Sequence, residues 1–124
     1  MPKILVTDDS SFMRSLVIKS LKGAGYNDFI EASSGKEAVQ LFKKQKTDLV
    51  LLDIVMGGDM DGIATLKEIK NIDKGAKIIM VTVVDQPKVT EEAKALGAKD
   101  FITKPVDPKK LVAAVKKALG AAKK

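Results

Sequence analysis

The sequence predicts one α/β domain in which helices cover both faces of a parallel sheet. Five short apolar runs alternate with five stretches of helical periodicity along 124 residues. The apolar runs are continuous, so each is expected to be a strand buried on both faces, as in parallel sheets. A chain of this length can enclose one core. Right-handed crossovers between the strands then place all five in one sheet.

The first predicted strand covers residues 3–7, and a helix follows it directly. One side chain of Asp8-Asp9-Ser10-Ser11 is expected to cap this helix, since an oxygen there accepts from a free N–H of the first turn. Glycines at positions 23 and 25 end the helix. Its apolar residues recur at helical spacing: Met13, Leu16, Val17 and Leu21.

The second strand is predicted at about 29–32 and the third at 49–52, which ends at Asp53. Between them Ser34 caps a helix over about 35–45, with Glu37 as its capping-box partner. After Asp53, a loop rich in Gly and Asp leads into the third helix. The inner positions of these two helices are Ala38, Leu41 and Phe42, then Ile63, Leu66, Ile69 and Ile72.

The last two strands are predicted at 77–81, ending at Thr82, and at 100–103, ending at Lys104-Pro105. Pro87 begins the fourth helix and Gly97 ends it. Asp107 caps the fifth helix, which has Pro108 at its first position. The inner positions of these helices are Val89, Ala93 and Leu96, then Leu111, Val112, Val115, Ala118 and Leu119.

Composition excludes several classes of function. Hydrophobic residues form 45% and charged residues 31% of the chain, as in soluble globular proteins. There is no cysteine or histidine, which excludes disulfides, zinc sites with Cys or His ligands, and imidazole catalysis. No signal peptide or membrane span is predicted, so we expect a cytoplasmic protein.

Positive charge is concentrated in the second half of the chain. Residues 1–60 carry eight basic and eight acidic side chains, whereas residues 61–124 carry fourteen basic and eight acidic, for a net charge of +6. A solvated lysine face explains this excess more simply than a patch for an acidic partner. The single arginine, Arg14, and the few aromatic residues argue further against nucleic acid. The lysines after the last acid, Asp107, are Lys109, Lys110, Lys116, Lys117, Lys123 and Lys124.

Polar side chains follow four of the five predicted strands. They are Asp8 and Asp9, Asp53, Thr82, and Lys104, and the carboxyl ends of parallel strands share one edge of the sheet. Each residue alone would be read as a cap, a turn or a surface residue, but the set is harder to explain in that way. Three neighbouring carboxylates need a cation, and oxygen ligands alone favour Mg²⁺. One carboxylate can then attack phosphorus, while Lys104 and Thr82 stabilise the phosphoryl oxygens.

These motifs resemble the receiver domain of two-component response regulators, and most of all its stand-alone chemotaxis members. The resemblance spans the chain and implies one receiver domain over residues 1–124, with a flavodoxin-like doubly wound sheet in strand order 2-1-3-4-5. The motifs that carry it are Asp8-Asp9 in VTDDSSFMR, Asp53 in LLDIVM, Met60-Asp61-Gly62, Thr82 in IIMVT, and Phe101 with Lys104-Pro105 in KDFITKP.

The resemblance also implies the chemistry of the site. Asp53 would accept a phosphoryl group from a phosphohistidine, and the Lys104-Pro105 bond would be cis. The implied ligands of Mg²⁺ are Asp9, Asp53, the backbone carbonyl of Val55, and Asp8 through water.

After phosphorylation, Thr82 and Phe101 would move and reshape the surface of the fourth helix, fifth strand and fifth helix. The implied partners are a sensor histidine kinase (CheA-like) and a separate target, such as a motor switch component or a phosphatase. Nucleic acid and membrane are not expected as partners, and we expect a monomer that is a phosphoacceptor switch and not an enzyme acting on metabolites.

The sequence departs from the family pattern near Asp53. One extra residue and the pair Gly57-Gly58 replace the usual proline, so this loop should be looser. Val83 is larger than the usual residue and would narrow phosphoryl access. Val55 and Val84 offer no polar group to orient a hydrolytic water, so we expect slow loss of the phosphoryl group.

Three alternative functions compete with this interpretation. Phosphatases of the haloacid-dehalogenase type carry the motif D-x-D after the first strand. This chain has Asp8-Asp9-Ser10-Ser11 there, which does not supply that motif. A flavodoxin-like electron carrier would hold a phosphate in that loop, where two aspartates would repel it. A receiver-shaped module that binds partners without phosphorylation stays open because of the altered loop after Asp53.

Overall fold

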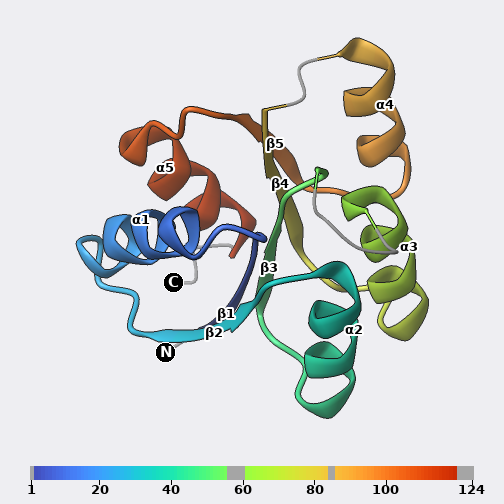
Figure 1. Ribbon diagram of the computed structural model, residues 1–124, viewed down its shortest axis with the longest axis horizontal. Coiled ribbons are helices and arrows are strands. Elements are labelled where there is room, and N and C mark those ends of the chain that lie inside the picture. The colour runs from blue at the N-terminus through green and yellow to red at the C-terminus, as the bar shows by residue number, and fades with distance from the viewer. Residues whose placement is uncertain (1, 56–60, 84–85, 120–124) are drawn as a thin grey trace.

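The computed structural model describes residues 2–55, 61–83 and 86–119. Within them, five parallel strands form one sheet in the order β2-β1-β3-β4-β5, which confirms the expected strand order (Figure 1). The strands are β1 (Lys3–Thr7), β2 (Asp28–Ala32), β3 (Leu49–Leu52), β4 (Ile78–Thr82) and β5 (Asp100–Thr103). The helices are α1 (Ser11–Lys22), α2 (Gly35–Lys44), α3 (Gly62–Ile72), α4 (Pro87–Ala95) and α5 (Pro108–Ala118).

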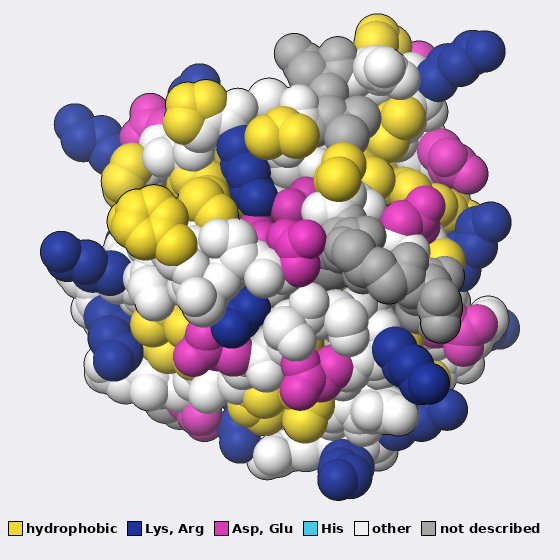
Figure 2. Space-filling model, in the orientation of Figure 1, with side chains coloured by type: hydrophobic (Ala, Val, Ile, Leu, Met, Phe, Trp, Pro, Cys, Tyr) yellow, Lys and Arg dark blue, Asp and Glu magenta, His cyan; other side chains and the backbone are white. Residues whose placement is uncertain are grey.

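The strand register brings the carboxyl ends of the strands to one edge. Thr7 at the end of β1 pairs with Ala32 of β2 and Leu52 of β3, and Thr82 of β4 pairs with Thr103 of β5. Acidic side chains gather near the middle of the face seen in Figure 2, where β1 and β3 end. The predicted site residues therefore lie on one edge of the sheet.

The helix caps follow the predicted pattern with one difference. Ser10 Oγ accepts from Met13 N at 3.2 Å, and Asp107 Oδ1 accepts from Lys109 N at 2.9 Å. Ser34 Oγ accepts from Glu37 N at 3.1 Å. The difference is that the Glu37 carboxylate accepts from the N–H of Ser33 at 2.6 Å, whereas in a capping box it would accept from the N–H of the cap residue, Ser34.

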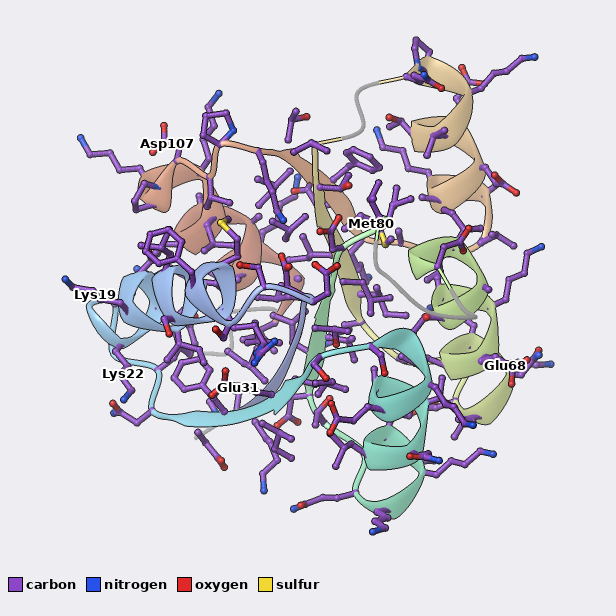
Figure 3. All side chains as sticks on the ribbon, in the orientation of Figure 1. Lys19, Lys22, Glu31, Glu68, Met80 and Asp107 are labelled. Carbon is purple, nitrogen blue, oxygen red and sulfur yellow. The ribbon has the colours of Figure 1, made fainter. Side chains whose placement is uncertain are left out.

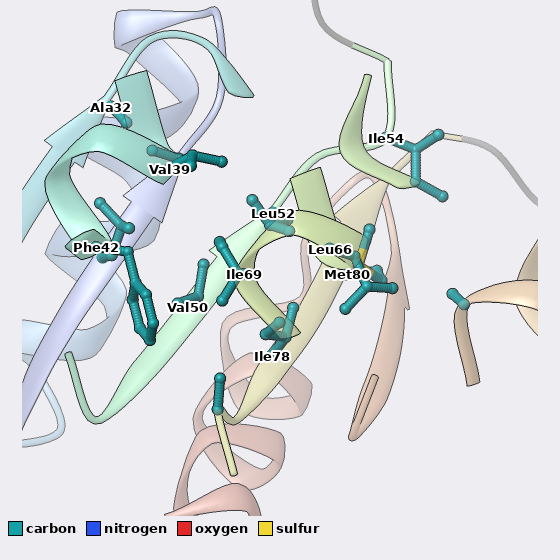
Figure 4. Packing of buried hydrophobic residues seen from close by; sticks show 14 residues of the cluster. Ala32, Val39, Phe42, Val50, Leu52, Ile54, Leu66, Ile69, Ile78 and Met80 are labelled. Carbon is teal, nitrogen blue, oxygen red and sulfur yellow. The ribbon is translucent and has the colours of Figure 1, made fainter. Parts of the chain in front are cut away.

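Alternate strand residues pack in two layers, as expected for a sheet that is covered on both faces. One layer faces α2, α3 and α4, and the other faces α1 and α5. In Figure 3, Met80 of β4 points into the interior, while Lys19 and Lys22 of α1 and Glu68 of α3 point outward. Figure 4 shows the first layer, in which Phe42 of α2 packs beside β3 and Ile69 of α3.

The apolar stripe of α1 is only partly buried. Val17 and Leu21 are buried, whereas Leu16 is 42% exposed and Phe12 is 69% exposed. Helical spacing therefore identified the packing face of α1 but was a poor guide to the burial of Leu16. No helix in the described ranges has the length and apolarity required to cross a membrane.

Candidate functional site

The backbone holds the site residues at the ends of adjacent strands. Asp8 follows β1, and its N–H donates to the carbonyl of Ala32 at 3.1 Å. Asp53 follows β3, and its N–H donates to the carbonyl of Thr7 at 3.2 Å. Lys104 follows β5, and its N–H donates to the carbonyl of Thr82 at 2.7 Å. The sheet hydrogen bonding thus continues into the site and fixes where each side chain starts.

The ammonium group of Lys104 joins two carboxylates. Its Nζ lies 2.7 Å from Asp8 Oδ2 and 2.9 Å from Asp53 Oδ2. The exposed fractions of the three side chains are 12% for Lys104, 9% for Asp8 and 6% for Asp53. The Lys104-Pro105 bond is cis, as the resemblance implied. The predicted meeting of these three side chains is confirmed.

The second oxygen of each buried carboxylate binds a backbone N–H. Asp8 Oδ1 accepts from Ser10 N at 2.9 Å, and Asp53 Oδ1 accepts from Val55 N at 3.1 Å. Each carboxylate is therefore held at both oxygens, and charge-assisted hydrogen bonds of this kind orient it firmly.

Burial by itself lowers the pKa of Lys104, because a charged group loses hydration. Hydrogen bonds to Asp8 and Asp53, together with the negative charge of both, outweigh this effect and raise the pKa of Lys104 above its ordinary value of 10.5. The ammonium group is therefore charged at neutral pH and balances one of the negative charges.

The carboxylates of Asp8, Asp9 and Asp53 form a cluster that could hold a cation. One oxygen from each lies within 4.8 Å of the others, and Asp9 is exposed while Asp8 and Asp53 are buried. These donors are all oxygen atoms, which suits a hard divalent cation such as Mg²⁺. The Val55 carbonyl as a further ligand stays a prediction.

Comparison with known proteins identifies the family. Residues 4–116 match the sequence model of the response regulator receiver domain. The chain belongs to the response-regulator receiver family. Its receiver fold and acidic pocket make it a CheY-like phosphoacceptor signalling protein and not a classical enzyme.

Similar receivers include stand-alone chemotaxis proteins. The chain is 43% identical over 115 residues to the chemotaxis protein CheY of Thermotoga maritima, covering 93% of this chain and 95% of that protein. It is 42% identical over 117 residues to CheY of Bacillus subtilis, covering 94% and 97%. A CheX–CheY complex of Borrelia burgdorferi with BeF₃ and Mg²⁺ contains a chain that is 34% identical, with a TM-score of 0.89 and coverage of 93% and 87%.

The two predicted switch residues of this receiver lie on neighbouring strands. Thr82 is fully buried at the end of β4. Phe101 of β5 pairs with Met80 of β4 and packs, partly buried, against the layer that faces α2, α3 and α4. Their roles in a switch stay predictions.

Exposed valines lie beside the acidic pocket of the receiver. Val55 is 54% exposed and Val83 is 63% exposed. The expected effect of Val83 on phosphoryl access and that of Val55 on hydrolytic water stay predictions. Gly57-Gly58 and Val84, on which other expectations depend, lie outside the described residues.

Sequence reasoning missed how tightly Gly62 packs. Its N–H donates to the carbonyl of Ile54 at 2.9 Å, and a Cβ at this position would collide with the carbonyl oxygen of Asp53. Only glycine allows α3 to begin this close to the segment that carries Asp53. The sequence signal is the Asp61-Gly62 pair, which by itself indicates only a family motif and the start of a helix.

Proposed function

We propose that residues 1–124 form one receiver domain that works as a phosphorylation-dependent switch, with Asp53 as the phosphoacceptor. The observation that carries this proposal is the buried Asp53 carboxylate, held by Lys104 and a backbone N–H beside Asp8 and Asp9. A carboxylate in this setting is oriented for attack and faces a fixed positive charge.

In the proposed step, a carboxylate oxygen of Asp53 attacks the phosphorus atom of a phosphohistidine on a sensor histidine kinase. An O–P bond forms and the N–P bond breaks, and its electron pair returns to the imidazole nitrogen. The Lys104 ammonium stabilises the negative charge on the phosphoryl oxygens. Mg²⁺ held by Asp8, Asp9 and Asp53, with the Val55 carbonyl, would add further positive charge there.

The resulting signal is a shift between two conformations. The phosphoryl group favours one arrangement only if it binds that arrangement better than the other. The Thr82 hydroxyl is the proposed contact for the phosphoryl group, and Phe101 then repacks on the adjacent strand. Because β4 and β5 support α4 and α5, this repacking changes the surface that α4, β5 and α5 offer to a target.

A protein donor must touch the rim of the site, and the rim has an apolar groove. This groove has a volume of about 440 Å³. Figure 2 shows hydrophobic side chains gathered over α1 and the beginning of α5. The apolar lining of the groove suits a protein partner better than a small polar metabolite. The groove is lined by Met13, Leu16, Ser20, Val83, Lys104, Pro105, Val106 and Pro108.

The proposed partners are a kinase as donor and a separate protein, such as a motor switch component or a phosphatase, as target. The Borrelia relative was solved with CheX, BeF₃ and Mg²⁺, which supports both a protein partner and Mg²⁺ for this chain. We also propose that the protein acts as a monomer in the cytoplasm.

The test is the intact mass of the protein after incubation with acetyl phosphate and Mg²⁺. We expect one phosphoryl adduct, lost in EDTA and in Asp53→Asn. Asp48→Asn is the matched control, because Asp48 lies directly before β3 whereas Asp53 lies directly after it. This variant should form the adduct as the unmodified chain does. If neither acetyl phosphate nor a cognate kinase gives an adduct, the chain is a binding module that works without phosphorylation.

A further inference from the structure

Arg14 ties the loop after β1 to the edge strand β2. Its Nη1 donates to the carbonyl oxygen of Asp8 at 2.6 Å, and its Nε donates to Glu31 Oε1 at 2.9 Å. The Arg14 side chain is 15% exposed, whereas Glu31 on β2 is 49% exposed. Figure 3 marks Glu31 on this strand. The partly buried guanidinium thus lies between the backbone of the acidic pocket and a solvent-facing carboxylate.

The carbonyl that Arg14 binds belongs to the peptide group that joins Asp8 to Asp9. Holding this peptide group restrains ψ of Asp8 and φ of Asp9, and so limits the directions in which both side chains leave the backbone. Asp8 is also held by its N–H, bonded to Ala32, by its Oδ1, bonded to Ser10 N, and by its Oδ2, bonded to Lys104 Nζ. In the described contacts, Arg14 supplies the restraint on the carbonyl side, next to the exposed Asp9.

We propose that Arg14 is a positioning residue for the divalent cation site, which it serves through the Asp8–Asp9 peptide group and not by touching the cation. This inference rests on the proposed function, because it requires that Asp8, Asp9 and Asp53 hold Mg²⁺. The planar fork of arginine directs donors to two acceptors at once, whereas a lysine ammonium on a flexible stem does not hold that geometry.

Charge and positioning predict opposite results at Arg14. A positive charge close to a cation site repels the cation, so removing the charge alone would tighten Mg²⁺ binding. Removing the hydrogen bond from Arg14 to the Asp8 carbonyl would weaken Mg²⁺ binding, because the side chains of Asp8 and Asp9 would lose part of their alignment. Changes to groups that orient metal ligands typically lower metal affinity by about 10- to 100-fold. The direction of the change therefore separates the two explanations.

The experiment titrates Mg²⁺ into the full chain by calorimetry at constant ionic strength. Arg14→Lys keeps the charge and loses the fork, and Arg14→Met loses both. We expect both variants to bind Mg²⁺ roughly tenfold more weakly than the unmodified chain. Lys22→Gln removes one charge from the last turn of the same helix and should change the affinity less than about twofold. Urea unfolding in EDTA verifies that each variant is folded during the titration.

Two outcomes would overturn the inference on its own: Arg14→Lys binding Mg²⁺ as the unmodified chain does, or Arg14→Met binding it more tightly. Absence of Mg²⁺ binding by the unmodified chain would refute the proposed metal site and this inference together. Lysine is a good helix former, so Arg14→Lys should fold and keep the test decisive.

Discussion

Replacing Lys104 by methionine should destabilise the protein in the absence of divalent cations. The change removes hydrogen bonds of 2.7 Å and 2.9 Å and leaves the buried carboxylates of Asp8 and Asp53 without their cation. Removing one partner of a buried ion pair costs about 3–5 kcal/mol. Because the exposed Asp9 borders the pocket, water can reach it, and we take the lower end. The free energy of unfolding should fall by about 3 kcal/mol, which lowers Tm by roughly 10 °C.

Urea unfolding at pH 7.5 in EDTA measures this loss, and repeating it with Mg²⁺ should make the loss smaller, since Mg²⁺ restores positive charge to the cluster. Lys99→Met is the control, because Lys99 is exposed and its loss should change stability by no more than about 0.5 kcal/mol. A loss below about 1 kcal/mol for Lys104→Met in EDTA would refute the ion-pair argument.

The pH dependence of this difference follows from the raised pKa of Lys104. A lysine whose pKa is raised on folding stabilises the protein fully below its unfolded pKa, and the contribution is lost as pH rises through the folded pKa. The difference between the unmodified chain and Lys104→Met should therefore be constant between about pH 7 and 10 and shrink only above 10.5. A difference that shrinks between pH 7 and 10 would contradict this assignment.

Three further predictions concern other residues around the site. Gly62→Ala should lower the free energy of unfolding, measured with urea, by more than about 3 kcal/mol, because its Cβ would collide with the Asp53 backbone. The control is Gly25→Ala, which should lower it by only about 1 kcal/mol, because Gly25 has a positive φ but open space around it. Thr7→Val should raise the free energy of unfolding by about 1 kcal/mol, because Thr7 Oγ1 is buried and has no hydrogen-bond partner in the described ranges. A lower free energy of unfolding would contradict this and show that the hydroxyl makes a hydrogen bond. Val55→Asn should shorten the phosphoryl lifetime by up to roughly tenfold by orienting water, as followed by intact mass over time, and an unchanged lifetime would remove Val55 as a cause of slow hydrolysis.

The strands and their common edge could be predicted because the information is local. A continuous apolar run such as residues 49–52 fits a strand buried on both faces, and the residue after each strand must lie at the carboxyl edge. The same rule places Asp8, Asp53 and Lys104 together from the sequence alone. The strand order came from the family resemblance, since periodicity does not show which strands are neighbours.

The contacts that the sequence did not reveal connect residues far apart in the chain. Glu31 is 17 residues from Arg14, and their contact exists only because β2 pairs with β1 beside α1. Lys104 was expected to serve the phosphoryl group, but its simultaneous contact with Asp8 depends on the spacing of three strand ends. Leu16 fits the helical spacing of α1 yet remains exposed, because spacing does not show how far a neighbouring helix extends.

The acidic pocket is built from residues that directly follow the strands, while the two layers of helices present their outer faces to solvent. Substitutions on those outer faces can therefore accumulate without moving the carboxylates or Lys104. Residues that set partner choice are therefore largely distinct from those that carry the phosphoryl chemistry, and an engineer could redirect the target of this receiver by redesigning the exposed surface of α4, β5 and α5 while leaving the pocket unchanged.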